Sequence, residues 1–150
     1  MDLAYKISSL LLLGWALTGC GRPPVPQRRI QVQQNWALQA GSQVAGYAVS
    51  GGLGDITLNL AGDAVQMPFD GEVQPTPGGC LLLSSAEVPA YLFRLCGVKR
   101  AKLGWRRQRQ PIGHADQLVF ATLRKQPDGT WVMVEPSTQL IEQFVTGERG

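Results

Sequence analysis

The chain has 150 residues and a formal net charge of +3, which leaves room for one domain with a single core. Its 18 Gly and 10 Pro, with aromatic residues at only 7%, favour a turn-rich β domain over a helical one. Beyond the N-terminal apolar stretch, no run of apolar residues is long enough to span a membrane.

The N-terminal apolar stretch, residues 7–19, ends at a cysteine. Its last residues, Leu17-Thr18-Gly19-Cys20, resemble the lipobox of bacterial lipoproteins, in which the Cys receives lipid on its sulfur and becomes the new N-terminus. The stretch is too short for a mature membrane span but suits the apolar region of a signal peptide. The alternative is a buried core helix that ends at a chance cysteine, because only Lys6 gives the leader a positive charge.

The segment after Cys20 is rich in Pro and Arg and shows no periodicity, which is typical of a flexible tether. We therefore expect a signal peptide over residues 1–19, the lipidated Cys20 and its tether over 20–29, and a β domain over 30–150. A lipidated Cys20 would anchor the domain to a membrane on its periplasmic or lumenal face, where nucleic acid is not an expected partner.

Short apolar segments bounded by Gly, Pro and Asp-Gly then follow along the chain. Strands are expected at residues 44–49, 55–60, 64–67, 71–74, 80–85, 91–96, 118–125 and 130–135. The sequence Gln126-Pro127-Asp128-Gly129 predicts the turn that joins the last two. A helical pattern (Leu140, Ile141, Phe144 and Val145) follows Ser137, a suitable N-cap. The expected interior residues are Leu58, Leu82, Phe93, Leu118 and Phe120.

Three cysteines are present, and lipidation of Cys20 would leave Cys80 and Cys96 as a possible pair. If Ser85 lies opposite Tyr91 in the expected hairpin, antiparallel counting puts Cys80 opposite Cys96, close enough for a disulfide. The alternative is two reduced cysteines in the core.

Several motifs resemble the M23 (LytM-type) metallopeptidase domain, from about Gly51 onward. The family's Gly-x-x-Val-x-x-Pro-x-x-Gly-x-Val run is matched by Gly62, Val65, Pro68, Gly71 and Val73. Looser matches follow in the family's order: the strands over 80–95, the turn over 104–113, the strand over 118–125, and Val134-Glu135-Pro136 before the helix. The resemblance implies a barrel-sandwich hybrid fold with a short C-terminal helix.

The zinc-binding histidines of that family are not matched. By the same alignment one falls near Gly51, the His-x-His pair becomes Leu118 and Phe120, and the assisting His becomes Arg94. Asp55 alone remains, whereas catalytic zinc requires three protein ligands. The single His of the chain, His114, reads as a solvated turn residue. We therefore expect no metal, no cofactor, no catalytic residue and no peptidase activity.

Six basic residues fall within eleven positions that contain no acid and have Trp105 at their centre. They are Lys99, Arg100, Lys102, Arg106, Arg107 and Arg109. The simplest interpretation is a solvated loop, and the functional one is a patch for anionic lipid, an acidic protein face or an anionic cell-wall polymer.

Two functions follow from these observations. The chain is either a binding or regulatory module for peptidoglycan or an envelope protein, as degenerate relatives of the resembled family are, or a structural accessory subunit docked on a membrane complex.

Overall fold

The computed structural model describes residues 30–32, 36–52 and 54–147. The expected signal peptide, Cys20 and the tether up to residue 29 lie outside these residues.

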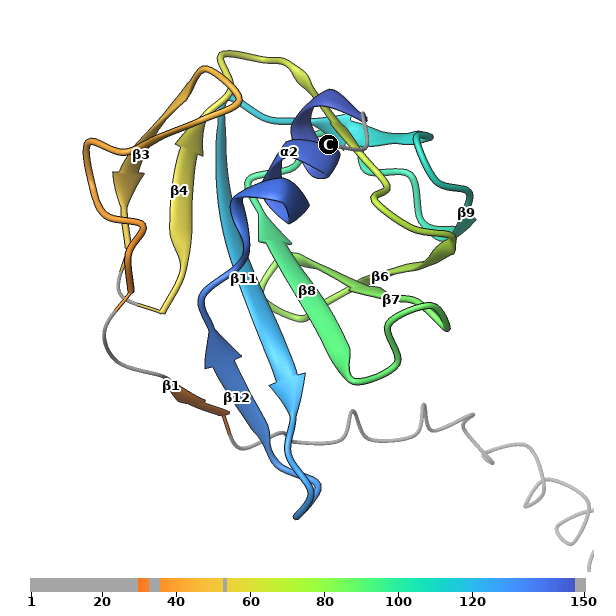
Figure 1. Cartoon of the computed structure of the whole chain (residues 1–150). Helices are drawn as coiled ribbons and strands as arrows, with labels where there is room; N and C mark the ends of the chain where they lie inside the picture. Colours follow the sequence, from red (N-terminus) through yellow and green to blue (C-terminus); the bar gives the residue numbers. More distant parts are fainter. Residues whose placement is uncertain (1–29, 33–35, 53, 148–150) are drawn as a thin grey trace, which may run out of the picture.

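The described chain is mainly β, with one helix at its C-terminal end, as the composition predicts (Figure 1). The strands are β1 (Ile30–Val32), β2 (Gln43–Val44), β3 (Tyr47–Gly51), β4 (Ile56–Asn59), β5 (Ala64–Gln66), β6 (Gly71–Pro75), β7 (Leu81–Ser84), β8 (Tyr91–Cys96), β9 (Gly104–Arg106), β10 (Pro111–His114), β11 (Gln117–Lys125) and β12 (Trp131–Val134). The helix, α2, spans Thr138–Thr146.

Most strands join one ten-stranded sheet in the order β2-β3-β4-β11-β8-β7-β6-β9. The nine-residue strand β11 is its centre: it pairs with β8 along one edge and with β4 and then β12 along the other. Pairing is antiparallel throughout this sheet except between β1 and β12, which run parallel. Strands β5 and β10 form a separate antiparallel pair. The helix lies across the face of the sheet formed by β8 and β11 (Figure 1).

The main core lies between this face and α2. Phe120 of β11 is fully buried, and its ring centroid lies 4.8 Å from that of Phe144 and 6.3 Å from that of Phe93. Leu58 and Leu118, which are paired across β4 and β11, are also fully buried. The prediction that these side chains lie inside is therefore confirmed for four of the five expected residues.

Leu82 is the exception. In β7 it pairs with Arg94 of β8, whereas its neighbours Leu81 and Leu83 are buried in the main core. Because side chains alternate between the faces of a strand, Leu82 lies on the opposite face, half-buried against a smaller cluster that includes Leu92. The run of three leucines gave no alternation from which its face could be chosen.

One expected strand is divided. Residues 44–49 were expected to be continuous, but Val44 and Tyr47 are paired with each other across a two-residue turn. The turn residues Ala45 and Gly46 have φ of 50° and 82°. A tight two-residue hairpin turn requires positive φ at both positions. Ala at the first position is not a typical residue for such a turn, so the sequence did not predict it.

Candidate functional site

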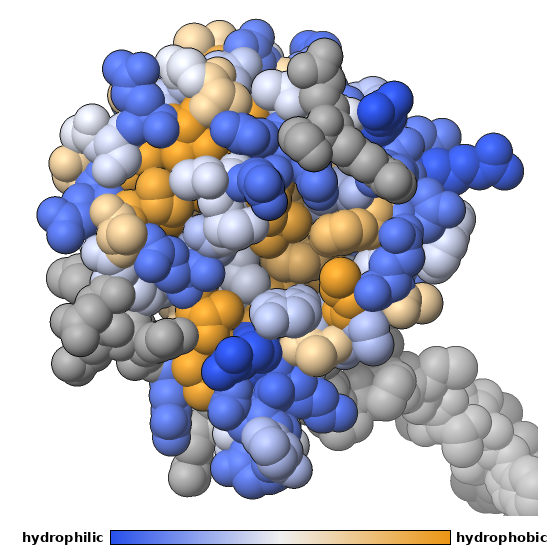
Figure 2. Space-filling view, viewed as in Figure 1, coloured by the Kyte–Doolittle hydropathy of each residue, from blue (hydrophilic) through white to orange (hydrophobic). Residues whose placement is uncertain are grey.

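A recess of about 450 Å³ opens between α2 and the adjoining ends of β8 and β11. Its apolar walls come from Phe69, Val88, Phe93, Pro136 and Leu140, which belong to three separate segments of the chain. In the space-filling view, apolar side chains reach the surface beside α2 with hydrophilic residues around them (Figure 2).

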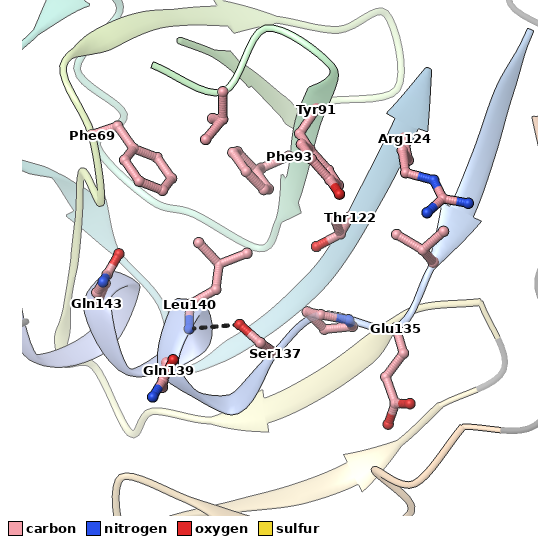
Figure 3. A pocket seen from close by; sticks show the side chains of 13 residues that line it. Phe69, Tyr91, Phe93, Thr122, Arg124, Glu135, Ser137, Gln139, Leu140 and Gln143 are labelled. Carbon is pink, nitrogen blue, oxygen red and sulfur yellow. Dashed lines mark hydrogen bonds between the residues drawn. The ribbon is translucent and has the colours of Figure 1, made fainter. Parts of the chain in front are cut away.

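Two buried polar atoms of residues that line this recess have no partner among the residues described. Thr122 is only 3% exposed, and its Oγ1 neither donates nor accepts a hydrogen bond there. The Oε1 atom of Gln143, also buried, is unpaired in the same way. Figure 3 shows the Thr122 hydroxyl directed into the space between Phe93 and Leu140. A buried polar group without a partner costs about 1–3 kcal/mol, so these atoms are the unusual feature of the recess.

Strand register and helix capping place these groups. Thr122 is directly opposite Phe93 in the β11–β8 ladder, so both side chains point to the face that α2 covers. The helix begins after Ser137, whose Oγ accepts a hydrogen bond from the Leu140 amide at 3.2 Å, as the sequence predicts. Its buried residues, Ile141, Phe144 and Val145, turn Leu140 and Gln143 toward the recess (Figure 3).

The charged residues of the recess stand at its rim. Arg124 is exposed, and Glu135 accepts a hydrogen bond from the Leu38 amide at 2.6 Å. Figure 3 shows the charged ends of both side chains directed away from the interior. The interior therefore offers apolar contact and neutral hydrogen-bonding groups, which suits a ligand that has apolar side chains and amides.

The positions expected to correspond to the zinc site do not converge. Asp55 Oδ2 lies 3.4 Å from Arg94 Nη2, and Arg94 is directly opposite Ala121. Leu118 and Phe120 point to the other face of β11, into the main core. Asp55 is thus an ion-pair partner of Arg94, and Leu118 and Phe120 lie on the opposite face of the sheet from Arg94.

His114 is exposed, and its backbone is bridged to that of Lys99. Across residues 30–32, 36–52 and 54–147, no three His, Cys, Asp or Glu side chains are grouped so that they could hold a metal ion.

Cys80 and Cys96 are joined by a disulfide, with their Cα atoms 4.3 Å apart. Leu81, which follows Cys80, is paired with Leu95, which precedes Cys96. The two cysteines are therefore opposite each other, and the register expected for the hairpin is confirmed.

The basic stretch runs through the loop after β8, through β9 and into the turn before β10. Lys99 forms an ion pair with Asp116, and Arg106 donates from Nη2 to the Leu103 carbonyl at 2.8 Å. The other basic residues of the stretch are exposed: Arg100, Lys102, Arg107 and Arg109. This surface shares no residue with the recess beside α2. The sequence patterns did not predict that recess.

No described helix is both long and apolar enough to cross a membrane. No protein-family model matches the chain, and no curated protein is significantly similar to it.

Proposed function

We propose that this chain is a non-catalytic, lipid-anchored binding module of the bacterial envelope, with a degenerate M23-like, barrel-sandwich type of domain. The observation that supports binding most directly is the recess beside α2, where Thr122 and Gln143 keep unpaired oxygens among apolar walls. Buried polar groups in folded proteins are nearly always satisfied, so two unpaired oxygens in the wall of a recess mark a place where a ligand would supply the missing partners.

The ligand class that fits is a peptide segment, either from peptidoglycan or from an envelope protein. Peptides carry an amide N–H, which the Gln143 oxygen accepts, and a carbonyl, to which the Thr122 hydroxyl donates. An apolar side chain would then contact Phe69 and Phe93. The proposal excludes hydrolysis, because the family's histidine positions hold Arg94, Leu118 and Phe120, none of which is a zinc ligand.

We expect the Thr122→Val variant to be more stable than the wild type but to bind the ligand more weakly. We expect the free energy of unfolding to rise by about 1 kcal/mol, because the buried hydroxyl is unpaired and Val has nearly the same shape. We expect retention on purified peptidoglycan sacculi, or photo-crosslinking from position 139 to an envelope partner, to fall about fivefold, because a hydrogen bond to the ligand is lost. Urea unfolding and sedimentation with sacculi measure the two effects.

Thr57→Val is the matched control, because Thr57 is in the same sheet but pairs with Val119 on the other face. It should leave binding unchanged. A Thr122→Val variant that is less stable than the wild type, or that binds as well, would show that the hydroxyl has a structural role and no ligand.

The alternative is a structural accessory subunit. The exposed basic stretch around β9 favours it, since a charged surface suits docking on a larger complex. In that case crosslinks would form from β9 and not from the recess, and Thr122→Val would leave them unchanged.

The proposed anchor has a direct test. Cys20→Ser should leave an uncleaved precursor or move the protein from the membrane fraction to the soluble fraction, because the thioether that carries the lipid cannot form. Cell fractionation with immunoblotting measures this. Normal processing and an unchanged membrane fraction in Cys20→Ser would disprove the anchor.

A further inference from the structure

Strand β9 forms one end of the main sheet and has a single partner, β6, among the described strands (Figure 1). Its middle residue, Trp105, is 61% exposed and is paired with Glu72 of β6, which is also exposed. The last strand of a sheet has an outer edge whose backbone N–H and C=O groups can pair with another chain. A large apolar side chain on such an edge is unusual, because edges are normally protected by charged residues.

The hydrogen bonds of β6 show which way the backbone of each of its residues points. Directly after β6, the Thr76 N–H donates to the Cys80 carbonyl at 2.8 Å, so at this position the backbone faces β7. The backbone groups of successive residues in an antiparallel strand face its two neighbours alternately. The β6–β7 ladder has no register shift. Counting back from Thr76, Glu72 therefore faces β7, whereas Gly71 and Val73 face β9.

The same alternation leaves the backbone of Trp105 at the outer edge. Gly104 is paired with Val73 and Arg106 with Gly71, so both bond to β6. Trp105 lies between them, and its N–H and C=O therefore point away from the sheet. Among the described residues, neither group is bonded to any residue outside the β6–β9 ladder.

The neighbouring groups along this outer edge are already satisfied. The Leu103 carbonyl accepts a hydrogen bond from Arg106 Nη2 at 2.8 Å, and the Arg107 N–H donates to Gln110 Oε1 at 2.9 Å. These side chains cap the edge on both sides of Trp105, which prevents a long strand from pairing there. The open part is one residue long and offers one donor and one acceptor, the two groups that a single residue of an added strand requires.

Cations stand at both ends of this open edge. Lys102 precedes β9 and Arg107 follows it; both are exposed, and neither forms an ion pair within the described part of the chain. If two copies of the chain paired through Trp105, Arg107 of one copy would lie beside Lys102 of the other, and like charges across strands are destabilising. A partner strand with acids near these two positions has the complementary charge.

We propose that the open edge of β9, defined as the backbone N–H and C=O of Trp105 with the flanking Lys102 and Arg107, binds an extended acidic segment of a partner protein. One residue of the segment exchanges two backbone hydrogen bonds with Trp105, as in other cases where a peptide adds a strand to a sheet. An antiparallel segment needs an acid two residues before that residue, near Arg107, and another three residues after it, near Lys102. The indole ring contacts an apolar side chain of the segment. This site shares no residue with the α2 recess, so the inference does not depend on what the recess binds.

The test measures the binding of a labelled probe peptide, Glu-Thr-Val-Thr-Thr-Glu with blocked ends, to the full chain in nonionic detergent at low salt by fluorescence anisotropy. One matched probe carries Gln in place of both Glu residues. A second carries an N-methyl group on Val, which removes the N–H that would donate to the Trp105 carbonyl. We expect the loss of both charges to weaken binding about tenfold, and the N-methyl group to weaken it about tenfold as well.

Variants of the chain separate the backbone of Trp105 from its side chain. Trp105→Ala keeps the N–H and should weaken binding about threefold, whereas Trp105→Pro also removes the N–H and should weaken binding about twentyfold. Because that N–H lies outside the ladder, the circular dichroism and urea midpoint of Trp105→Pro should match those of Trp105→Ala. Lys102→Gln should weaken binding about threefold.

Lys125→Gln is the matched control, because it removes the same charge from an exposed position at the end of β11 and should leave binding unchanged. Equal losses for Lys102→Gln and Lys125→Gln, or equal binding of the Gln probe, would overturn the proposal of an acidic partner. Equal binding of the N-methylated probe would overturn strand addition, even if Trp105→Pro failed to fold. Loss of probe binding in Thr122→Val would place the probe in the α2 recess, which would overturn the proposal for β9 and support the function proposed for the recess.

Discussion

Removal of the disulfide in a Cys80→Ser/Cys96→Ser double variant is expected to lower the free energy of unfolding by about 3 kcal/mol. The bond closes a loop between residues 16 apart in sequence, and a crosslink of that span reduces the entropy of the unfolded chain by about this amount. The fold should persist, because the hairpin register is also fixed by Leu81, Leu83 and Phe93 in the main core. Urea unfolding under oxidising conditions gives the value.

The wild-type protein in reductant is the internal control, since it should unfold at the same urea concentration as the double variant. The reductant should not change the urea concentration at which the double variant unfolds. Equal stability of the oxidised wild type and the double variant would show that the bond does not constrain the chain.

Phe120→Ala is expected to cost about 4 kcal/mol, enough to unfold much of the protein at physiological temperature. The ring is fully buried between Phe93 and Phe144, so its removal forfeits apolar burial and leaves a cavity beneath α2. Thermal and urea denaturation followed by circular dichroism would measure the loss.

Trp105→Ala provides the comparison, because it also deletes an aromatic ring but from a position that is 61% exposed. Its effect on stability should stay within about 0.5 kcal/mol. If Phe120→Ala were as mild, the helix would not be packed against the sheet as described.

The elements that the sequence predicts best are those whose signals are local. The hairpin between residues 80 and 96 and the turn at Pro127-Asp128-Gly129 are both present, and the first has the register expected for it. The helix start is similar, since Ser137 can satisfy a free backbone N–H without help from distant residues.

Features that depend on distant residues were not predictable in this way. The face on which Leu82 lies is set by its pairing with Arg94 of β8. The short strands β1 and β9 form because they pair with β12 and β6. The recess is harder still: a Thr inside the apolar strand 117–125 is ordinary in sequence. It becomes notable only when the fold buries it without a partner.

For the anchor proposed at Cys20, the parallel pairing of β1 with β12 has a mechanical consequence. A pull from residues before Ile30 would enter the described domain at Ile30, which is paired with Trp131 next to the turn that joins β11 to β12 (Figure 1). A pull along the strand axis would load the pairs of Ile30, Gln31 and Val32 together, whereas a pull across the strands would open them one after another. Tension would therefore be carried by β12 and passed to β11, the strand that holds the rest of the sheet together.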